Sequence, residues 1–295
     1  MTQASRVAAG TIVLGVVVLG LKLAAWWVTG SAALFSDAAE TVVNVAASVV
    51  AWYAIGLAAK PADANHPYGH DKAEFFSAVV EGVLIVVAAL VILQHAWHSY
   101  LNPAPIEAAG LGMGLNAAST VLNAGWAWLL FQQGRKHRST ALRADAHHLL
   151  ADVVTSVGVL AGVGLVLATG LAWLDPAIAA ATAAYILVSG FFIIRESVGG
   201  LMDAAPAGVI VERIRTIVGQ HADGAIEAHD LRTRHAGRLT FLEFHLVVPG
   251  AMTVSAAHEI CDRIETALKA EMEGLMITIH VEPEGKAKHR GVLVL

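Results

Sequence analysis

Two pairs of polar side chains lie inside stretches of sequence that are otherwise apolar. Glu40 and Asn44 are four residues apart in one stretch, and His148 and Asp152 are four residues apart in another. Because a helix places residues i and i+4 on the same face, each pair presents two side chains at one point. Together the pairs offer two carboxylates, an amide oxygen and an imidazole, which suit a four-coordinate divalent cation.

Packing is the alternative explanation for these residues, because polar side chains also hydrogen-bond one membrane helix to another. We expect Asn116 and Asn123 to be such contacts, and the ammonium of Lys22 to reach outward to the membrane surface. Ionisable residues inside a membrane usually mark ion or proton pathways. Two matching pairs therefore favour a metal site, and Asp37, three residues before Glu40, joins the same helix face.

A second cluster of metal-binding residue types lies in a polar connection. Asp63, His66 and His70 fall within eight residues of one another, and Pro67 and Gly69 bend the chain between them. Their spacing allows all three side chains to bind one ion. The alternative is a short polar loop with solvated histidines.

Composition defines the environment of both clusters. The chain has 56% hydrophobic residues, a mean hydropathy of +0.62 and 15% charged residues, whereas soluble domains contain about 25% charged residues. The sequence therefore predicts an integral membrane protein surrounded by lipid. The net charge of −5 gives no basic surface for nucleic acid. The single Cys261 forms neither an internal disulfide nor a thiolate site, so metal ligands must be imidazoles, carboxylates and amides.

Apolar segments near or above the ~20 residues that a bilayer requires predict six transmembrane helices. Lys and Arg gather before the first helix, in the connections after the second and fourth, and at the end of the sixth. By the positive-inside rule, both termini are cytoplasmic in a multi-pass cell-membrane protein, which in a bacterium is an inner-membrane protein. The predicted helices are 7–29, 31–59, 74–100, 108–133, 141–169 and 175–200.

The remainder of the chain reads as a cytoplasmic domain. From about Pro206 the hydrophobic periodicity predicts helix, strand, strand, helix and strand, an αββαβ order typical of a ferredoxin-like or metallochaperone-like α+β fold. We expect a transport domain over residues 1–204 and a metal-binding dimerisation domain over residues 205–295.

Alternation along the predicted strands separates the tail histidines from its core. Leu242 and Phe244 share one face of their strand, and His245 lies on the other. By the same rule, His280 and Glu282 lie opposite the apolar residues of the last strand. Two strands thus present His245, His280 and Glu282 on faces that do not need burial.

The sequence resembles the cation diffusion facilitators, which are divalent metal/proton antiporters, and in particular their bacterial zinc and iron efflux members. The resemblance covers nearly the whole chain and rests on seven segments. They are "SDAAETVVNVAAS", "HPYGHDKAE", "ADAHHLLADVVTS", "LMD", "AHDLRTRHAG", "FLEFHL" and "IHVEP". It implies a homodimer that exports a cytoplasmic metal ion in exchange for protons by alternating access.

The resemblance also implies roles for individual residues. The transport site falls on Glu40, Asn44, His148 and Asp152, and the loop site on Asp63, His66 and His70. Zinc-transporting members usually carry His or Asp, then Asp four residues later, in the second helix, so Glu40 and Asn44 depart from that pattern. Lys72 and Asp203 resemble a charge pair at the base of the membrane domain, although two solvated charges are the alternative. The tail sites, which bridge two subunits, fall on His229, His245, His258, His280 and Glu282.

The ligand set leaves the metal open. Zinc is favoured by the family, cobalt suits the same ligands, the three oxygen donors suit manganese or iron, and cadmium is a further alternative. A membrane metal sensor without net transport is the second functional hypothesis. An intramembrane metalloenzyme is disfavoured, because neither ligand set carries an accompanying general base as HExxH does, and we expect no enzymatic activity.

Overall fold

The chain forms two compact units in the computed structural model. One unit comprises Met1–Tyr53 and Ser77–Arg195, and the other comprises Ala54–Phe76 and Glu196–Leu295. The second unit therefore contains the loop after the second helix together with the tail. The structure describes residues 3–136, 140–206, 208–237, 239–288 and 291–293.

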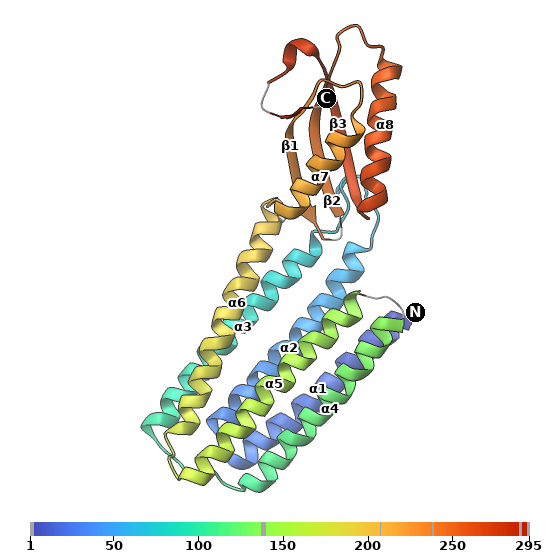
Figure 1. Ribbon diagram of the computed structural model, residues 1–295. Coiled ribbons are helices and arrows are strands. Elements are labelled where there is room, and N and C mark those ends of the chain that lie inside the picture. The colour runs from blue at the N-terminus through green and yellow to red at the C-terminus, as the bar shows by residue number, and fades with distance from the viewer. Residues whose placement is uncertain (1–2, 137–139, 207, 238, 289–290, 294–295) are drawn as a thin grey trace. The chain divides into compact units, whose positions relative to one another are not determined.

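Long helices occupy the first two thirds of the chain (Figure 1). Each is close in extent to a predicted apolar segment and runs one to four residues beyond it at some ends. Within the described residues they are α1 (Gln3–Thr29), α2 (Ala32–Ala58), α3 (Ala73–Leu101), α4 (Ala109–Lys136), α5 (Thr140–Thr169) and α6 (Leu174–Leu201).

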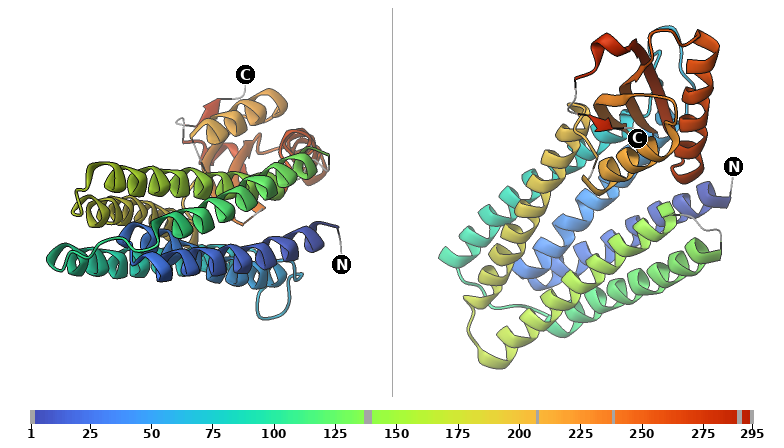
Figure 2. Two further views of the ribbon diagram at one scale, coloured as in Figure 1. Left: turned by 90° about the horizontal axis from the view of Figure 1, so that it is seen from below. Right: turned by 45° about the horizontal axis from the view of Figure 1, so that its top comes forward.

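Helix α4 is the least apolar of these helices. Among the described residues, the other five are long and apolar enough to cross a membrane by length and composition. On α4, Asn116, Ser119, Thr120 and Asn123 are all buried, because α4 packs between α1 and α5 (Figures 1 and 2). Its polar residues thus face other helices, and the predicted polytopic helical fold is confirmed.

The start of α2 is fixed by a carboxylate from another helix. Asp175, in the first turn of α6, accepts hydrogen bonds from the backbone N–H groups of Ala32 and Ala33 at 2.6 and 3.3 Å, and from Ser31 Oγ at 2.6 Å. The first N–H groups of a helix lack partners within it, so this contact satisfies them. It also ties the beginning of α2, the helix that carries Glu40, to α6.

Small residues bring α3 and α6 together. A Cβ added to Gly82 would lie 2.5 Å from Ile194 Cγ1, and one added to Gly190 would lie 2.7 Å from Ile85 Cγ2. Side chains at these positions would separate the helices, so the glycines permit a close contact of the kind common between membrane helices.

The tail contains one mixed sheet with order β3-β2-β1-β4. β1 pairs antiparallel with β2 and β4, and β2 pairs in parallel with β3. A parallel pair needs a crossover connection, and α8 provides it. The elements are α7 (Gly208–His221), β1 (Glu227–Ala236), β2 (Leu239–Val248), α8 (Val254–Glu271), β3 (Leu275–Pro283), a 3₁₀ turn η1 (Glu284–Lys286) and β4 (Val292–Leu293).

The helices α7 and α8 cover one face of this sheet (Figure 1). Ile217 of α7 and Ile264 of α8 pack with Leu242, Phe244 and Leu246 of β2 in a single core. The predicted αββαβ order and the alternation along β2 are confirmed. The added strand β4 escaped prediction because two residues are too few to show a period-2 pattern.

Candidate metal sites

A cavity of about 40 Å³ lies among α1, α2, α4 and α5. Asn44 of α2, and His148 and Asp152 of α5, lie on its wall. The predicted i,i+4 spacing places the two α5 residues on one helix face, toward α2. The lining residues are Thr11, Ile12, Gly15, Val18, Thr41, Asn44, Val45, Ser48, Asn123, His148, Leu149 and Asp152.

Asn44 and Asp152 are in direct contact across this cavity. The amide Nδ2 of Asn44 donates to both carboxylate oxygens of Asp152, at 3.1 and 3.0 Å. Both side chains are half-buried, whereas His148 is exposed. The contact brings together one member of each predicted pair.

Glu40 lies one turn before Asn44 and is half-buried. Its carboxylate experiences the negative charges of Asp152 and Asp37 and the positive charge of Lys22. Glu40 does not line the cavity. Within the described residues, Glu40, His148 and Asp152 do not bring three ligand atoms within 4.8 Å of one another. The four predicted transport residues thus share a region but do not form a closed ligand shell.

Lys22 does not reach outward as expected. Its side chain is 2% exposed, and its Nζ donates to Asp37 Oδ1 at 2.8 Å and to Ser156 Oγ at 2.9 Å. Ser156 Oγ in turn donates to Asp37 Oδ1 at 2.9 Å, and Asn116 Nδ2 donates to Asp37 Oδ2 at 2.5 Å. An ammonium beside a buried carboxylate is more stable there than in hydrocarbon, so the ion pair replaces the expected route to the surface.

These four residues, Lys22, Asp37, Asn116 and Ser156, form what we call the buried network. Each comes from a different helix, namely α1, α2, α4 and α5. The packing role expected for Asn116 is confirmed, since it hydrogen-bonds α4 to α2. One sequence feature indicated an ion pair for Lys22. An opposite charge, Asp37, lies inside a second apolar segment.

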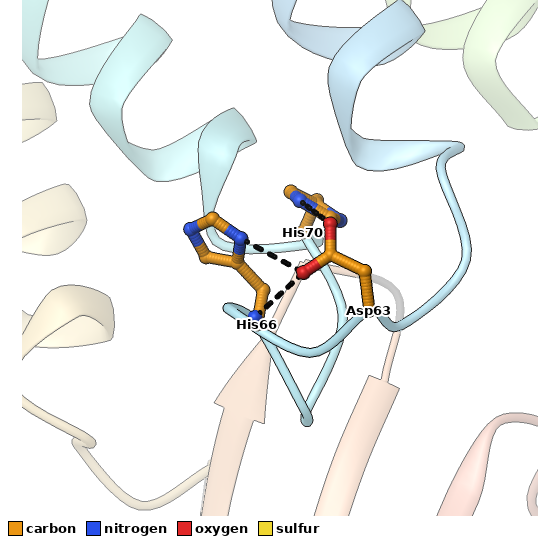
Figure 3. A group of neighbouring side chains, drawn as sticks. All are labelled: Asp63, His66 and His70. Atoms are coloured by element: carbon orange, nitrogen blue, oxygen red, sulfur yellow. Dashed lines mark hydrogen bonds and ion pairs between the residues drawn. The ribbon is translucent and has the colours of Figure 1, made fainter.

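The loop between α2 and α3 brings its predicted ligands together (Figure 3). The carboxylate of Asp63 faces both rings, with Oδ1 3.3 Å from His66 Nδ1 and Oδ2 3.4 Å from His70 Nε2. Gly69 has a φ of 87°, a conformation that suits glycine, so the chain turns between the two histidines.

Backbone groups hold the Asp63 carboxylate in place. The N–H of His66 donates to Asp63 Oδ1 at 2.8 Å, and the N–H of Asn65 donates to the same atom at 2.9 Å. The hydrogen bond from His66 is the main cause that lowers the pKa of Asp63 below its ordinary value. A carboxylate that stays ionised and fixed is a prepared metal ligand.

Charges anchor this loop to the beginning of the tail. Lys72 Nζ lies 2.8 Å from Asp203 Oδ1, so the predicted pair forms within one chain. This hydrogen bond is the main cause that lowers the pKa of Asp203 below its ordinary value. Arg234 also approaches Asp203, at 3.4 Å, and its guanidinium lies over the rings of Tyr68 and Phe241.

The tail histidines gather around one carboxylate. Glu282 lies 3.4 Å from His229 Nε2, 3.3 Å from His245 Nδ1 and 3.8 Å from His280 Nε2. The register explains this, because His245 is paired with His229 on β1 and with His280 on β3. Four of the five predicted tail residues are therefore neighbours on one sheet face.

The ring nitrogens of His229 are poorly satisfied. Its side chain is 3% exposed, and within the described residues Nδ1 and Nε2 form no hydrogen bond. Buried polar atoms usually have partners, so the ring is suited to an ion. Glu227 and Glu282 are its nearest carboxylates, at 3.7 and 3.4 Å.

Sequence reasoning missed Asp230 beside this cluster. With His229 and His245 it forms a group whose ligand atoms lie within 4.8 Å of one another. Asp230 has a φ of 52° at an irregularity in the β1–β2 pairing, so it leaves the alternation from which we predicted strand faces. Lys288 hydrogen-bonds to Asp230 and thereby lowers the pKa of that carboxyl.

His258 stands apart from the other predicted tail residues. It lies on α8, its side chain is 74% exposed, and its Nε2 is 3.6 Å from Asp262 Oδ1. Within the described residues it joins neither group of potential ligands. A role for His258 at the strand cluster of its own chain is therefore not supported by this geometry.

Comparison with protein families gives two matches. Residues 9–202 match a cation efflux transmembrane domain, and residues 206–284 match the cytoplasmic domain of cation efflux proteins.

Individual relatives are similar over most of their length. An uncharacterized transporter, sll1263, from Synechocystis sp. is 44% identical over 265 residues, which cover 90% of this chain and 86% of the relative. The cation-efflux pump FieF from Shewanella oneidensis is 31% identical over 281 residues, which cover 95% and 93%.

Two solved structures match a smaller part of the chain. CzrB in its zinc form is 50% identical, covers 29% of this chain and 98% of its own, and has a TM-score of 0.28. The metal-bound C-terminal domain of the CzcD transporter from Thermotoga maritima is 26% identical, covers 28% and 100%, and has a TM-score of 0.26.

Proposed function

The chain belongs to the cation diffusion facilitator family of cation-efflux membrane proteins, and from this premise we propose that it exports a divalent metal ion from the cytoplasm in exchange for protons. The metal ion is its cargo, moved by alternating access across the membrane domain. The family is one of transporters, so the reaction is translocation of an ion and not a covalent change.

The cavity among α1, α2, α4 and α5 is the observation that supports this proposal most directly. Asn44, His148 and Asp152 line it within otherwise apolar helices. Ionisable residues at such a depth are costly unless they serve an ion pathway. We assign the transport site to these three residues and to Glu40, whose charge interacts with that of Asp152.

The Asn44 amide would have to turn before its oxygen could bind a metal ion beside Asp152. Asn44 presents its NH₂ group to Asp152, and an NH₂ group cannot coordinate a cation. On loading, the amide rotates so that its oxygen faces the ion, and Asp152 exchanges an amide donor for the metal. The hydrogen bonds thus hold the Asp152 carboxylate in position at the proposed site.

Proton exchange follows from the same ligands. Imidazole and carboxylate groups must be deprotonated to bind a metal ion, so protons and the ion compete for His148, Asp152 and Glu40. A site that opens alternately to each side then exchanges one for the other without a separate proton channel. Capture at the less acidic face and release at the more acidic face give export its direction.

The proposed cargo is zinc, with cobalt, manganese, iron and cadmium as alternatives. A single imidazole among oxygen donors is compatible with each of the first four ions, and the affinity order alone does not select among them. The loop cluster around Asp63 and the tail cluster around Glu282 are proposed as further metal sites. The tail sites, including His258, act between the two subunits of a homodimer with both termini in the cytoplasm.

Metal flux into proteoliposomes tests the proposal. Purified protein is reconstituted with a metal-sensitive dye inside, and zinc is added outside with and without an imposed pH gradient. We expect zinc uptake that accelerates when the lumen is acidic. A protein that binds zinc at its tail but gives no flux under either condition would instead be the metal sensor.

A further inference from the structure

The buried network occupies one end of the cavity. On α1 the cavity residues run from Thr11 to Val18, and Lys22 follows them; on α5 the cavity ends at Asp152, and Ser156 comes one turn later. The helices α2 and α4 run in the opposite direction, and there the order is reversed. Asp37 precedes Thr41, Asn44, Val45 and Ser48 on α2, and Asn116 precedes Asn123 on α4.

All four helices therefore place the network on the same side of the cavity. The antiparallel arrangement of α1 and α4 is explicit in their contacts, since Trp126 Nε1 donates to Thr11 Oγ1 at 3.0 Å and Gly112 packs against Thr29. The network thus forms a floor between the cavity and the end of the bundle at which α1 ends and α2 begins.

This floor is closed by tight polar contacts. The residues Lys22, Asp37, Asn116 and Ser156 are each 2% exposed or less. Asp37 accepts three hydrogen bonds, and the ammonium of Lys22 donates to both Asp37 and Ser156. An ion in the cavity would have to separate these groups to move on toward that end.

The floor also contains a cationic group, the ammonium of Lys22, which is paired with Asp37. Besides Asp37, the carboxylates of Glu40 and Asp152 interact electrostatically with Lys22. Coulomb interactions between charged groups are stronger where water is excluded than in bulk water. The ammonium is therefore a fixed positive charge on the side of the proposed site toward the end of α1.

We propose that Lys22, held by Asp37, is a gating residue. It closes the transport path between the cavity and the end of the bundle at which α1 ends and α2 begins. This inference deepens the proposed function and rests on it. In the ion-free molecule, Asp37, Glu40 and Asp152 together attract the ammonium and keep the path closed. A divalent ion bound by Glu40 and Asp152 offsets that attraction and repels Lys22, so the barrier is weakest when the site is loaded.

A packing role alone would not require these charges. Replacing a buried ion pair by neutral groups of similar volume often leaves stability unchanged, and the glycine contacts elsewhere in the bundle need no charge. A barrier to a divalent cation does require one. The two roles are separable, because a neutral substitution of the pair removes the charge while it preserves the volume.

Thiol labelling of Thr41 tests the gate. Thr41 lines the cavity one turn from Asp37, and Thr41→Cys is introduced together with Cys261→Ser. Membrane vesicles of each orientation are treated with a charged, impermeant maleimide. We expect labelling only from the cavity side, which is the side of the membrane away from the buried network. With Lys22→Met and Asp37→Asn added, labelling from the opposite side should rise at least about tenfold, which corresponds to about 1.4 kcal/mol.

Three further variants serve as controls for the labelling experiment. Lys22→Arg keeps the charge and should remain closed, Trp126→Phe removes a different α1–α4 hydrogen bond and should also remain closed, and Ser156→Ala should give a smaller rise than the double variant. An opposite-side rate equal to that of the parent in either the double variant or Ser156→Ala, with cavity-side labelling retained, overturns the gate. Labelling needs no metal flux, so this outcome is distinct from a failure of the proposed transport.

Discussion

Asn44 donates from a single nitrogen to both carboxylate oxygens of Asp152, at 3.1 and 3.0 Å. The contact joins α2 to α5 beside the cavity and satisfies a half-buried carboxylate without neutralising it. Asp at position 44 could not donate in this way, because an ionised carboxylate only accepts hydrogen bonds. Asn44 therefore determines both the charge of the proposed site and the position of Asp152 before an ion arrives.

Asn44→Asp should tighten metal binding and change its selectivity. The substitution adds a negative charge and a stronger ligand, so we expect at least about a tenfold lower Kd and slower release. The order of preference among zinc, cobalt, manganese and iron should also change, because ligand type contributes to selectivity. Competition calorimetry on the detergent-solubilised protein measures both effects.

Asn123→Asp is the matched control for this substitution. Asn123 lines the same cavity from α4, so its replacement adds the same charge away from the α2 pair. We expect it to alter affinity but to leave the order of the four ions unchanged. Identical competition profiles for Asn44→Asp and the parent protein would exclude residue 44 as a ligand.

His148→Ala and Asp152→Ala should each abolish metal flux while leaving an assembled dimer. Both side chains line the cavity, and in the proposed mechanism they bind the ion and are not needed to pack the helices. His98→Ala, which removes an exposed histidine from the last turn of α3, should leave flux unchanged. Flux into proteoliposomes and size-exclusion chromatography provide the two measurements, and parental flux in either cavity variant would remove that residue from the mechanism.

Sequence periodicity predicted the fold well because the signals are local. The apolar segments that became α1 to α6 are long, and Leu242 and Phe244 alternate with polar residues as a half-buried strand requires. The strand β4 was missed because Val292 and Leu293 pair with β1, more than sixty residues away. No local pattern carries such a pairing.

The loop site was the most directly predictable, because neighbours in sequence supply its ligands. Asp63 and His70 lie seven residues apart in one loop, and the structure brings them together. The contact of Lys22 with Ser156 spans 134 positions, so no local pattern indicated it, and the snorkelling rule predicted the wrong direction. Asp230 was missed because its left-handed backbone conformation breaks strand alternation.

Zinc should stabilise the tail through the cluster around Glu282. An ion that binds only the folded state raises stability by RT ln(1 + [L]/Kd), which is about 2.7 kcal/mol at about 100 times Kd. We expect residues 206–295 to melt at a higher temperature with zinc added. Glu282→Gln should remove most of this increase, because Glu282 contacts three histidines.

His258→Ala separates zinc binding within one tail domain from zinc binding that depends on the dimer. His258 is exposed and belongs to neither group of potential ligands among the described residues, so its loss should reduce only the part of the zinc effect that depends on dimer formation. Sedimentation with and without zinc measures dimer formation directly. A melting temperature of the parent tail that does not respond to zinc would show that the tail histidines do not form a zinc site.

Lys72→Met should destabilise the second unit in a pH-dependent manner. Lys72 lowers the pKa of Asp203 in the folded state, so their pair contributes fully above the unfolded pKa of about 3.9. That contribution is lost as the pH falls through the folded-state value. The pair is exposed, so we expect a loss of at most about 1 kcal/mol. Thermal melts should differ from the parent at neutral pH and converge in strong acid; an equal difference at both would exclude the ion pair as the cause.

Metal affinity should fall as the pH drops from about 7.5 to about 5.5. The ligands bind metal only when deprotonated, and imidazole is the side chain that ordinarily changes charge in this range. His148 is therefore the proposed proton carrier, and His148→Asp should weaken the pH dependence or move it to lower pH. Calorimetric titration across this range gives the affinity at each pH.

The same titrations count the protons. When binding is measured in two buffers of different ionisation enthalpy, the difference in apparent heat gives the number of protons released per ion. Antiport through these ligands requires that number to be well above zero within this pH range, and to fall in His148→Asp. A count near zero across the whole range would mean that the ion and protons do not compete. Transport by this protein would then be uniport, even if every cavity residue proved to be a ligand.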